Sequence, residues 1–364
     1  MIISELISSL EQYAPLGLQE SYDNSGLLIG NYNDKINQAL VCLDVTPAVI
    51  DEAIRTKSSL IVAHHPIIFK GLKKINGNSL VERVIRKAIK NDICIYAMHT
   101  NLDNALNGVN SILASKLGIT NMRILSPSAS KLNKLVCFCP DEHAGEVRQA
   151  LFDSGAGHIG NYDNCSYNLK GEGSFRALEN TNPFVGEKGK THFEGETRIE
   201  TVVPDFKLPL VVKAMIQAHP YEEVAYDVYP LENKSLASGA GMIGELETEE
   251  NIEDFLASVK NILGTKYLKH NRLVAKTVKK VAVCGGSGSF LIDAAARQKA
   301  DVFITGDIKY HDYFEHQGEM TIVDAGHYET EQFTKELIHT ILTKNFPNFA
   351  VRISETATNP VSFL

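Results

Sequence analysis

The stretch Leu60-Ile61-Val62-Ala63-His64-His65-Pro66 places two adjacent histidines directly after four apolar residues. A short apolar run of this kind, between a helical pattern and a proline, predicts a buried strand of a parallel sheet. Ligands of open α/β sheets bind beyond the carboxyl ends of the strands, which is where both histidines lie. The pair indicates either a metal site or a chance pair, with one imidazole in the core and the other in solvent.

The residues before this strand predict a strand–helix–strand unit. Residues 38–43 have the composition of a strand, which ends at Asp44. Thr46 and Pro47 are favoured at the N-cap and first position of a helix, which we expect to run to about Thr56. Because a helix that joins two parallel strands makes a right-handed crossover, the sequence favours an α/β fold.

A further strand, predicted at 93–98 after a helix, also ends in polar residues, among them His99 and Asp103. The carboxyl ends of parallel strands meet at one edge of a sheet, so we expect these side chains beside His64 and His65. Taken alone, Asp103 is more simply interpreted as a turn residue or a helix cap.

The same order of elements recurs far downstream, where strands are predicted at 278–284, 302–305 and 321–324. The last strand is followed by His327 and Glu331, whose spacing puts both side chains on one face of a helix. Such pairs are common and usually solvated, but this one follows an apolar strand, as the earlier candidates do. Mixed imidazole and carboxylate ligands suit zinc, manganese, iron or another divalent ion. The candidate ligands are His64, His65, Asp103, His327 and Glu331.

Two other segments are weaker candidates. The glycine-rich segment 285–288 lies between a strand and a helix, where it forms either an anion cradle or a tight turn without a ligand. It matches neither a Walker A motif nor a complete dinucleotide-binding fingerprint. His219 lies in a predicted helix-to-strand turn, and a structural role is favoured over a ligand role.

The middle of the chain follows a different pattern, with the element order β-α-β-β-α-β of a ferredoxin-like domain. We therefore predict a domain inserted between two α/β halves. Its strands are predicted at 134–139, as a pair around 165–176, at 198–203 and at 224–229, and its helices at 141–153 and 208–218.

Composition excludes several classes of protein. The 364 residues are 44% hydrophobic and 22% charged, as in ordinary globular proteins, and the length suggests two or three domains. A net charge of -8 argues against general nucleic-acid binding. No apolar run approaches the roughly 20 residues of a membrane span, and the N-terminus predicts an amphipathic helix rather than a signal peptide. Six scattered cysteines without a C-x-x-C motif suggest reduced thiols in the cytoplasm.

Six segments resemble the GTP cyclohydrolase 1 type 2 homologues, which are also described as dinuclear metal-centre hexameric proteins. They are SYDNSGLLIG (21–30), VCLDVTPAVIDEAI (41–54), IVAHHPIIF (61–69), HTNLDNALNGVN (99–110), FITGDIKYHD (303–312) and DAGHYETE (324–331). The resemblance covers both halves of the chain. It implies two divalent metal ions per chain, zinc, manganese or iron, and a toroidal homohexamer with the metals facing an internal cavity. The implied ligands are His64, His65, Asp103, His327 and Glu331.

The resemblance also implies the domain organisation. Two similar α/β halves, 1–126 and 237–364, are expected to form one metal-binding core. The insert, 127–236, is similar to PII- and CutA-type trimeric modules. Two positions depart from the family pattern: Tyr22 stands where a tryptophan is common, and Met242 stands where the family commonly has arginine in a glycine-rich turn.

Two classes of function are consistent with these residues. As a metal-dependent hydrolase, the chain would use paired ions to activate water, with GTP as the substrate that the family name implies and a phosphoester as a rival. Asp103 or Glu331 would bridge the ions, and His99 would act as proton shuttle or orienting residue. The alternative is a non-catalytic metal-binding scaffold or sensor of a small molecule or nucleotide. Neither class requires a membrane partner.

Overall fold

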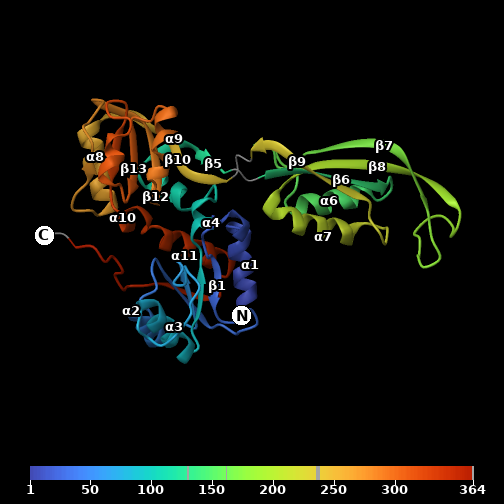
Figure 1. Cartoon of the computed structure of the whole chain (residues 1–364), viewed down its shortest axis with the longest axis horizontal. Coiled ribbons are helices and arrows are strands. Elements are labelled where there is room, and N and C mark those ends of the chain that lie inside the picture. Colours follow the sequence, from blue (N-terminus) through green and yellow to red (C-terminus); the bar gives the residue numbers. More distant parts are fainter. Residues whose placement is uncertain (129–130, 161, 235–237, 363–364) are drawn as a thin grey trace. The chain divides into compact units, whose positions relative to one another are not determined.

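The computed structural model describes residues 1–128, 131–160, 162–234 and 238–362 (Figure 1). The chain divides into two compact units. One, the core unit, consists of residues 1–127 and 237–364, and the other, the insert, consists of residues 128–236.

The first sheet of the core unit contains the strand that ends at His64. Its three central strands are parallel neighbours, as predicted, and the apolar strands are buried on both faces. The added edge strand β1 is antiparallel, and the strand β15, near the C-terminus, is parallel. The strand order is β1 (Gly26–Ile29), β4 (Cys94–Ala97), β3 (Leu60–Ala63), β2 (Gln38–Cys42) and β15 (Ala350–Ile353).

Helices that connect these strands form where the sequence favours them. Helix α2 (Pro47–Thr56) begins with the predicted cap, because the Thr46 side chain accepts a hydrogen bond from the Val49 N–H. Helix α3 (Leu80–Lys90) begins in the same way at Ser79. Both helices bury apolar side chains in one cluster with β2, β3 and β4. The other helices of this region are α1 (Ile3–Tyr13), η1 (Leu16–Leu18), α4 (Thr100–Asp103), α5 (Val109–Lys116) and α11 (Thr334–Asn345).

The second sheet repeats the arrangement of three parallel strands in β12, β13 and β14. Strand β12 extends to Ser287, so the predicted end at Cys284 was wrong and the glycine segment belongs largely to the strand. The strand order is β11 (Lys269–His270), β14 (Thr321–Asp324), β13 (Val302–Gly306), β12 (Thr277–Ser287), β10 (Gly239–Asn251) and β5 (Ile119–Pro127). Its helices are α8 (Ile252–Leu263), η3 (Ser289–Leu291), α9 (Ile292–Arg297), η4 (Tyr310–Phe314) and α10 (His327–Glu331).

The two sheets exchange strands between the two halves of the sequence. Strand β5 comes from the N-terminal half but pairs with β10 in the second sheet. Strand β15 comes from the C-terminal end but pairs with β2 in the first. Because each half completes the other's sheet, the halves fold as one unit.

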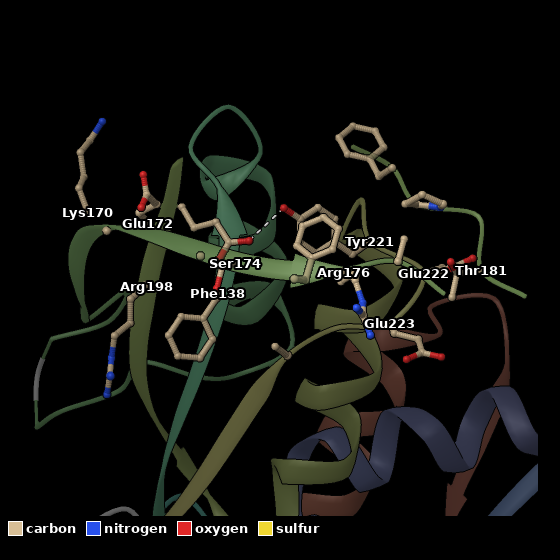
Figure 2. Close-up of a pocket in the computed structure, with 18 of the residues that line it drawn as sticks. Phe138, Lys170, Glu172, Ser174, Arg176, Thr181, Arg198, Tyr221, Glu222 and Glu223 are labelled. Atoms are coloured by element: carbon tan, nitrogen blue, oxygen red, sulfur yellow. Dashed lines mark hydrogen bonds between the residues drawn. The ribbon is translucent and has the colours of Figure 1, made fainter. Parts of the chain in front are cut away.

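The insert has the predicted element order, and its strands form one antiparallel sheet in the order β7-β8-β6-β9. The expected strand pair around 165–176 was wrong, because β7 fills that range and pairs with β8, which begins at Thr191. A cavity of about 570 Å³ lies within this unit (Figure 2). The elements are β6 (Lys131–Pro140), α6 (Ala144–Asp153), β7 (Ser166–Arg176), β8 (Thr191–Pro204), η2 (Asp205–Lys207), α7 (Leu208–Ala218) and β9 (Tyr226–Lys234).

His219 has a structural position in the insert. Its Nε2 lies 2.9 Å from the Phe138 carbonyl oxygen, and its Nδ1 accepts a hydrogen bond from the Tyr221 N–H. Both ring nitrogens are therefore engaged by backbone groups.

Helices α8 and α11 have 12 residues each. A membrane-spanning helix needs about 20 mostly apolar residues. In the described part of the chain, no helix has the length and apolar character to cross a membrane.

We predict that the insert can be removed without unfolding the core unit. Pro127 and Gly239 are paired neighbours at the ends of β5 and β10, so a two-residue turn such as Asn-Gly can join the two strands. The insert also has its own apolar cluster, to which the core unit contributes no residue. We expect the shortened chain to remain folded by circular dichroism and to retain the metal content of the full chain. Aggregation, or loss of the metal, would show that the insert completes the core.

Candidate metal centre

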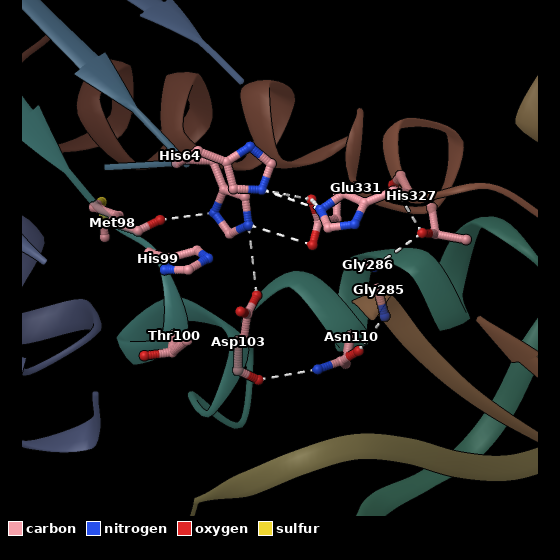
Figure 3. Close-up of polar contacts among 12 residues, drawn as sticks. His64, Met98, His99, Thr100, Asp103, Asn110, Gly285, Gly286, His327 and Glu331 are labelled. Carbon is pink, nitrogen blue, oxygen red and sulfur yellow. Dashed lines mark hydrogen bonds and ion pairs between the residues drawn. The ribbon is translucent and has the colours of Figure 1, made fainter. Parts of the chain in front are cut away.

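The five candidate ligands converge at the carboxyl ends of strands from both sheets, and Figure 3 shows His64, Asp103, His327 and Glu331. His64 and His65 directly follow β3, and Asp103 lies at the end of the short helix α4 after β4. His327 and Glu331 lie on α10, which follows β14. The structure therefore brings together residues that are up to 267 positions apart, as the spacing at each strand end predicts.

Glu331 lies at the centre of this group. Its Oε1 is 3.6 Å from the Nε2 of His64, and its Oε2 is 3.0 Å from the Nε2 of His65 and 3.1 Å from that of His327. Asp103 Oδ1 lies 3.7 Å from the Nε2 of His64. The two carboxylate oxygens of Glu331 thus face different groups of side chains.

Gly286 makes room for this carboxylate. Its φ is +61°, which favours glycine, and a Cβ atom there would lie 2.1 Å from Glu331 Oε1. The N–H groups of Gly285 and Gly286 donate to Asn110 Oδ1 and Thr330 Oγ1. Both N–H groups are used within the protein, so these two glycines do not form an anion cradle.

Each of the three histidines is held through its Nδ1, which turns Nε2 toward Glu331. The partner is the Met98 carbonyl oxygen for His64, at 2.7 Å, and Asp44 for His65, at 2.8 Å. For His327 it is Asp307, at 2.7 Å. An acceptor at one ring nitrogen fixes the proton there and leaves the other nitrogen as a ligand for a metal ion. Sequence analysis did not nominate Asp44 and Asp307, although both follow predicted strands.

His99 lies beside the group. Its ring centroid is 5.4 Å from those of His64 and His65, and its Nδ1 lies 2.7 Å from Asp23 Oδ1. Asp23 also accepts hydrogen bonds from the N–H and the hydroxyl of Thr100. Burial favours the protonated acid, but these hydrogen bonds outweigh it and hold the pKa of Asp23 well below its usual value. Asp23 was not predicted as a site residue, although it lies in the segment 21–30 that resembles the family.

Three buried polar atoms at the centre have no hydrogen-bond partner among the described residues. They are His64 Nε2, Asp103 Oδ1 and Glu331 Oε2, of which the last lies at ion-pair distance from the Nε2 atoms of His65 and His327. Orphaned buried polar atoms cost free energy and are rare in native proteins. Bound cations would satisfy these atoms.

The pKa shifts of the candidate ligands also fit a site for a cation. Burial lowers the pKa of His64, which keeps the ring neutral and its nitrogen lone pair available. Burial and the charge of Glu331 raise the pKa of Asp103 well above its usual value. Burial alone would raise the pKa of Glu331. The neighbouring imidazoles of His64, His327 and His65 outweigh burial and hold the pKa of this carboxyl well below its usual value. A divalent cation would compensate the two carboxylates in place of protons.

The ligand atoms of His64, His65 and Glu331 all lie within 4.8 Å of one another. This cluster can bind a metal ion, and its nitrogen and oxygen donors are those that zinc, manganese and iron accept. A cavity of about 540 Å³ adjoins it beside His65 and His327 and gives a small molecule access.

The two departures from the family pattern have different surroundings. Met242 is buried in the apolar cluster of the second sheet, away from solvent. Tyr22 is 63% exposed, and its ring centroid lies 6.3 Å from that of Phe69, which itself contacts the His99 ring. Position 22 therefore adjoins the candidate metal centre, whereas position 242 contributes to packing.

Comparison with known proteins identifies the family. The model of the Duf34/NIF3 (NGG1p interacting factor 3) family matches residues 1–360. Proteins named GTP cyclohydrolase 1 type 2 homolog from Halalkalibacterium halodurans and Bacillus subtilis are each 42% identical, over 99% of this chain and 98% of theirs. A solved Bacillus cereus protein related to NIF3 is 41% identical with a TM-score of 0.87, over 100% of this chain and 99% of that one. A Staphylococcus aureus structure is 31% identical with a TM-score of 0.77 over the same shares. The resemblance inferred from the sequence is confirmed, and the chain belongs to the Duf34/NIF3 family.

Proposed function

We propose that each chain holds two divalent cations, with Glu331 between them. One position would take His64, Asp103 and Glu331 Oε1, and the other His65, His327 and Glu331 Oε2. The observation that supports this proposal is the division of the Glu331 carboxylate, whose two oxygens face separate imidazoles. The three orphaned buried atoms fit the same arrangement. Of the two carboxylates that the sequence offered as a bridge, Glu331 is therefore preferred to Asp103.

We further propose that the chain is a metal-dependent hydrolase that acts on a nucleotide such as GTP. When bound, paired divalent ions supply a water molecule activated at neutral pH and stabilise developing negative charge. The printed name of the relatives, GTP cyclohydrolase 1 type 2 homolog, supports GTP as the first substrate to test. Phosphoester hydrolysis is the rival reaction for such a site.

His99 is proposed to hold and transfer a proton in this reaction. Asp23 accepts from its Nδ1, which fixes the tautomer and leaves Nε2 free to exchange a proton with substrate or water. The low pKa of Asp23 keeps this partner ionised, so that the aspartate accepts the hydrogen bond from Nδ1. The ring lies beside His64 and His65, close enough to serve the same substrate.

A non-catalytic scaffold or sensor is the alternative, and one observation favours it. The cavity beside the centre is lined by many carboxylates and a single lysine, Lys269, and this lining repels a triphosphate unless bound cations offset it. The carboxylate residues are Asp44, Asp307, Asp324 and Glu329.

Family resemblance supports three further proposals: a homohexamer whose metals face an internal cavity, an insert related to PII- and CutA-type modules, and a cytoplasmic location. The six cysteines are unpaired, which is consistent with a reducing compartment.

Metal binding is predicted to release protons. Burial alone would lower the pKa of His65 and His327, but contacts with Glu331, Asp44 and Asp307 raise them to about 10 and about 9. At neutral pH both rings then carry a proton that a metal ion must displace. We expect the apparent affinity for zinc to fall as the pH is lowered, and calorimetry in buffers of different ionisation enthalpy to detect release of about two protons per chain.

The stability of the metal-free protein should depend on pH in the opposite direction and should fall as the pH rises. Because these two pKa values are raised on folding, their contribution to stability is complete below pH 6.5, the pKa of free imidazole, and is lost as the pH rises through about 9 to 10.

His65→Ala should reduce the release of protons on metal binding, whereas His158→Ala, at an exposed position of the insert, should not. A heat of binding that is the same in all buffers would contradict the assignment.

Turnover of GTP tests the proposed enzyme. We expect protein reloaded with zinc, manganese or iron to convert GTP, and His65→Ala to lose activity together with bound metal. His99→Gln should keep its metal but lower kcat by roughly 10²-fold, because general acid–base catalysis contributes about this much. His158→Ala serves as the control with full activity.

Equal rates in wild type and His65→Ala would reveal a contaminating enzyme and refute the proposed activity. Loss of metal in His99→Gln would make this residue a ligand. Tight binding of GTP without turnover would favour the sensor.

A further inference from the structure

The cavity of about 570 Å³ lies entirely on residues of the insert and has the size of a small-molecule site. Its floor includes the face of the sheet that points away from the helices. Cys137 and Cys139 pack in the cluster with α6 and α7, so Phe138 between them points to the other face and lines the cavity. Loop 177–184 and the turn that begins at Tyr221 form the walls.

Aromatic rings form one side of this cavity. The Tyr221 ring centroid lies 6.0 Å from that of Phe175 and 6.2 Å from that of Phe184, with the planes tilted by 60° and 49°. Phe184 is 52% exposed, although exposure of a large aromatic ring is unfavourable. Rings at these angles offer faces and edges to a planar ligand.

A carboxylate, that of Glu196, lies next to the Tyr221 ring. Glu196 Oε1 accepts a hydrogen bond of 2.9 Å from the Tyr221 hydroxyl. Burial and the neighbouring Glu196 raise the pKa of Tyr221, so the hydroxyl stays protonated and donates. Oε2 lies over Gly173, where a Cβ atom would come within 2.2 Å of it. Glycine at 173 therefore lets the carboxylate lie across the sheet, with acceptor capacity to spare.

Two of the three basic residues in the lining are engaged with other acids. Arg198 Nε lies 2.9 Å from Glu200, and its guanidinium lies over the Phe138 ring. Lys170 Nζ lies 2.9 Å from Asp141. The lining also contains Arg176, together with Glu172, Glu222 and Glu223, so its four carboxylates outnumber its three basic residues, and Glu196 is the carboxylate that contacts the Tyr221 hydroxyl.

We propose that this cavity binds a small molecule with a planar aromatic ring that carries an amidine-like pair of N–H donors. The ring packs against Tyr221, Phe175 and Phe184, and the N–H groups donate to Glu196. A carboxylate matches such a pair in two parallel hydrogen bonds, and the positive charge of the ligand is attracted by the aromatic faces.

Benzamidine is the probe, and benzamide and benzoate are its neutral and anionic counterparts of similar shape. With the full-length protein, ligand-observed NMR titration should give benzamidine a Kd on the order of 1 mM, as expected for so small a ligand. Benzamide should bind at least ~10-fold more weakly, because one charge-assisted hydrogen bond is lost. Benzoate should not bind measurably.

Two variants of the lining test whether benzamidine binds in this cavity. Glu196→Gln and Gly173→Ala should each weaken benzamidine at least ~10-fold, the first by removing the charge and the second by displacing the carboxylate. Glu232→Gln, an exposed glutamate on β9 outside the lining, is the matched control and should have no effect. Equal binding of benzamidine and benzamide, an unchanged Kd in both pocket variants, or no saturable binding at about ten times the expected Kd would overturn the proposal.

Discussion

The position of the Glu331 carboxylate is the constraint on which the candidate metal centre depends. It is buried, and its oxygens lie 3.0 to 3.6 Å from the Nε2 atoms of His65, His327 and His64. A buried carboxylate is stable only with compensating charge or hydrogen bonds. The absence of a side chain at Gly286 admits it, and histidines from both sheets surround it. The surroundings of this carboxylate thus require residues from both halves of the core unit.

The exchange of strands between the two sheets helps to hold the two halves of the core unit in the positions that the site requires. Strand β15 joins the first sheet beside β2, and the segment after it is fixed by Glu52, which is 5% exposed. Glu52 accepts hydrogen bonds from the Ser354 hydroxyl, the Glu355 N–H and Thr356. Further along, Thr358 donates to Asp44, the residue that holds His65. The C-terminal segment therefore supports a ligand that lies almost 300 residues earlier.

Much of the core was predictable from sequence because its signals are local. Apolar runs located β2, β3, β4, β13 and β14, and the polar residues after three of these strands gave the five candidate ligands. Strands β5, β10 and β15 were not anticipated, since their pairing depends on contacts between distant segments. The range 165–176 was misassigned for a related reason, because alternation of side chains does not reveal which strand is the partner.

The second layer of the site was harder to predict than the ligands. Asp44 and Asp307 follow strands at the correct edge, but only the fold shows that each accepts a hydrogen bond from a histidine. Gly286 suggested a turn or an anion cradle, whereas its role is to admit Glu331. Asp23 lies in the family-like segment 21–30, but no local feature marks it as the partner of His99. In each case the role depends on a partner that is remote in the chain.

The proposed pair of ions on either side of Glu331 can be located by diffraction. Anomalous diffraction at the absorption edge of the bound metal, on crystals of protein purified from metal-replete cells, measures this directly. We expect two peaks per chain, roughly 3.5–4 Å apart, on either side of the Glu331 carboxylate. A single peak coordinated by His64, His65 and Glu331 alone, or no peak at this carboxylate, would contradict it.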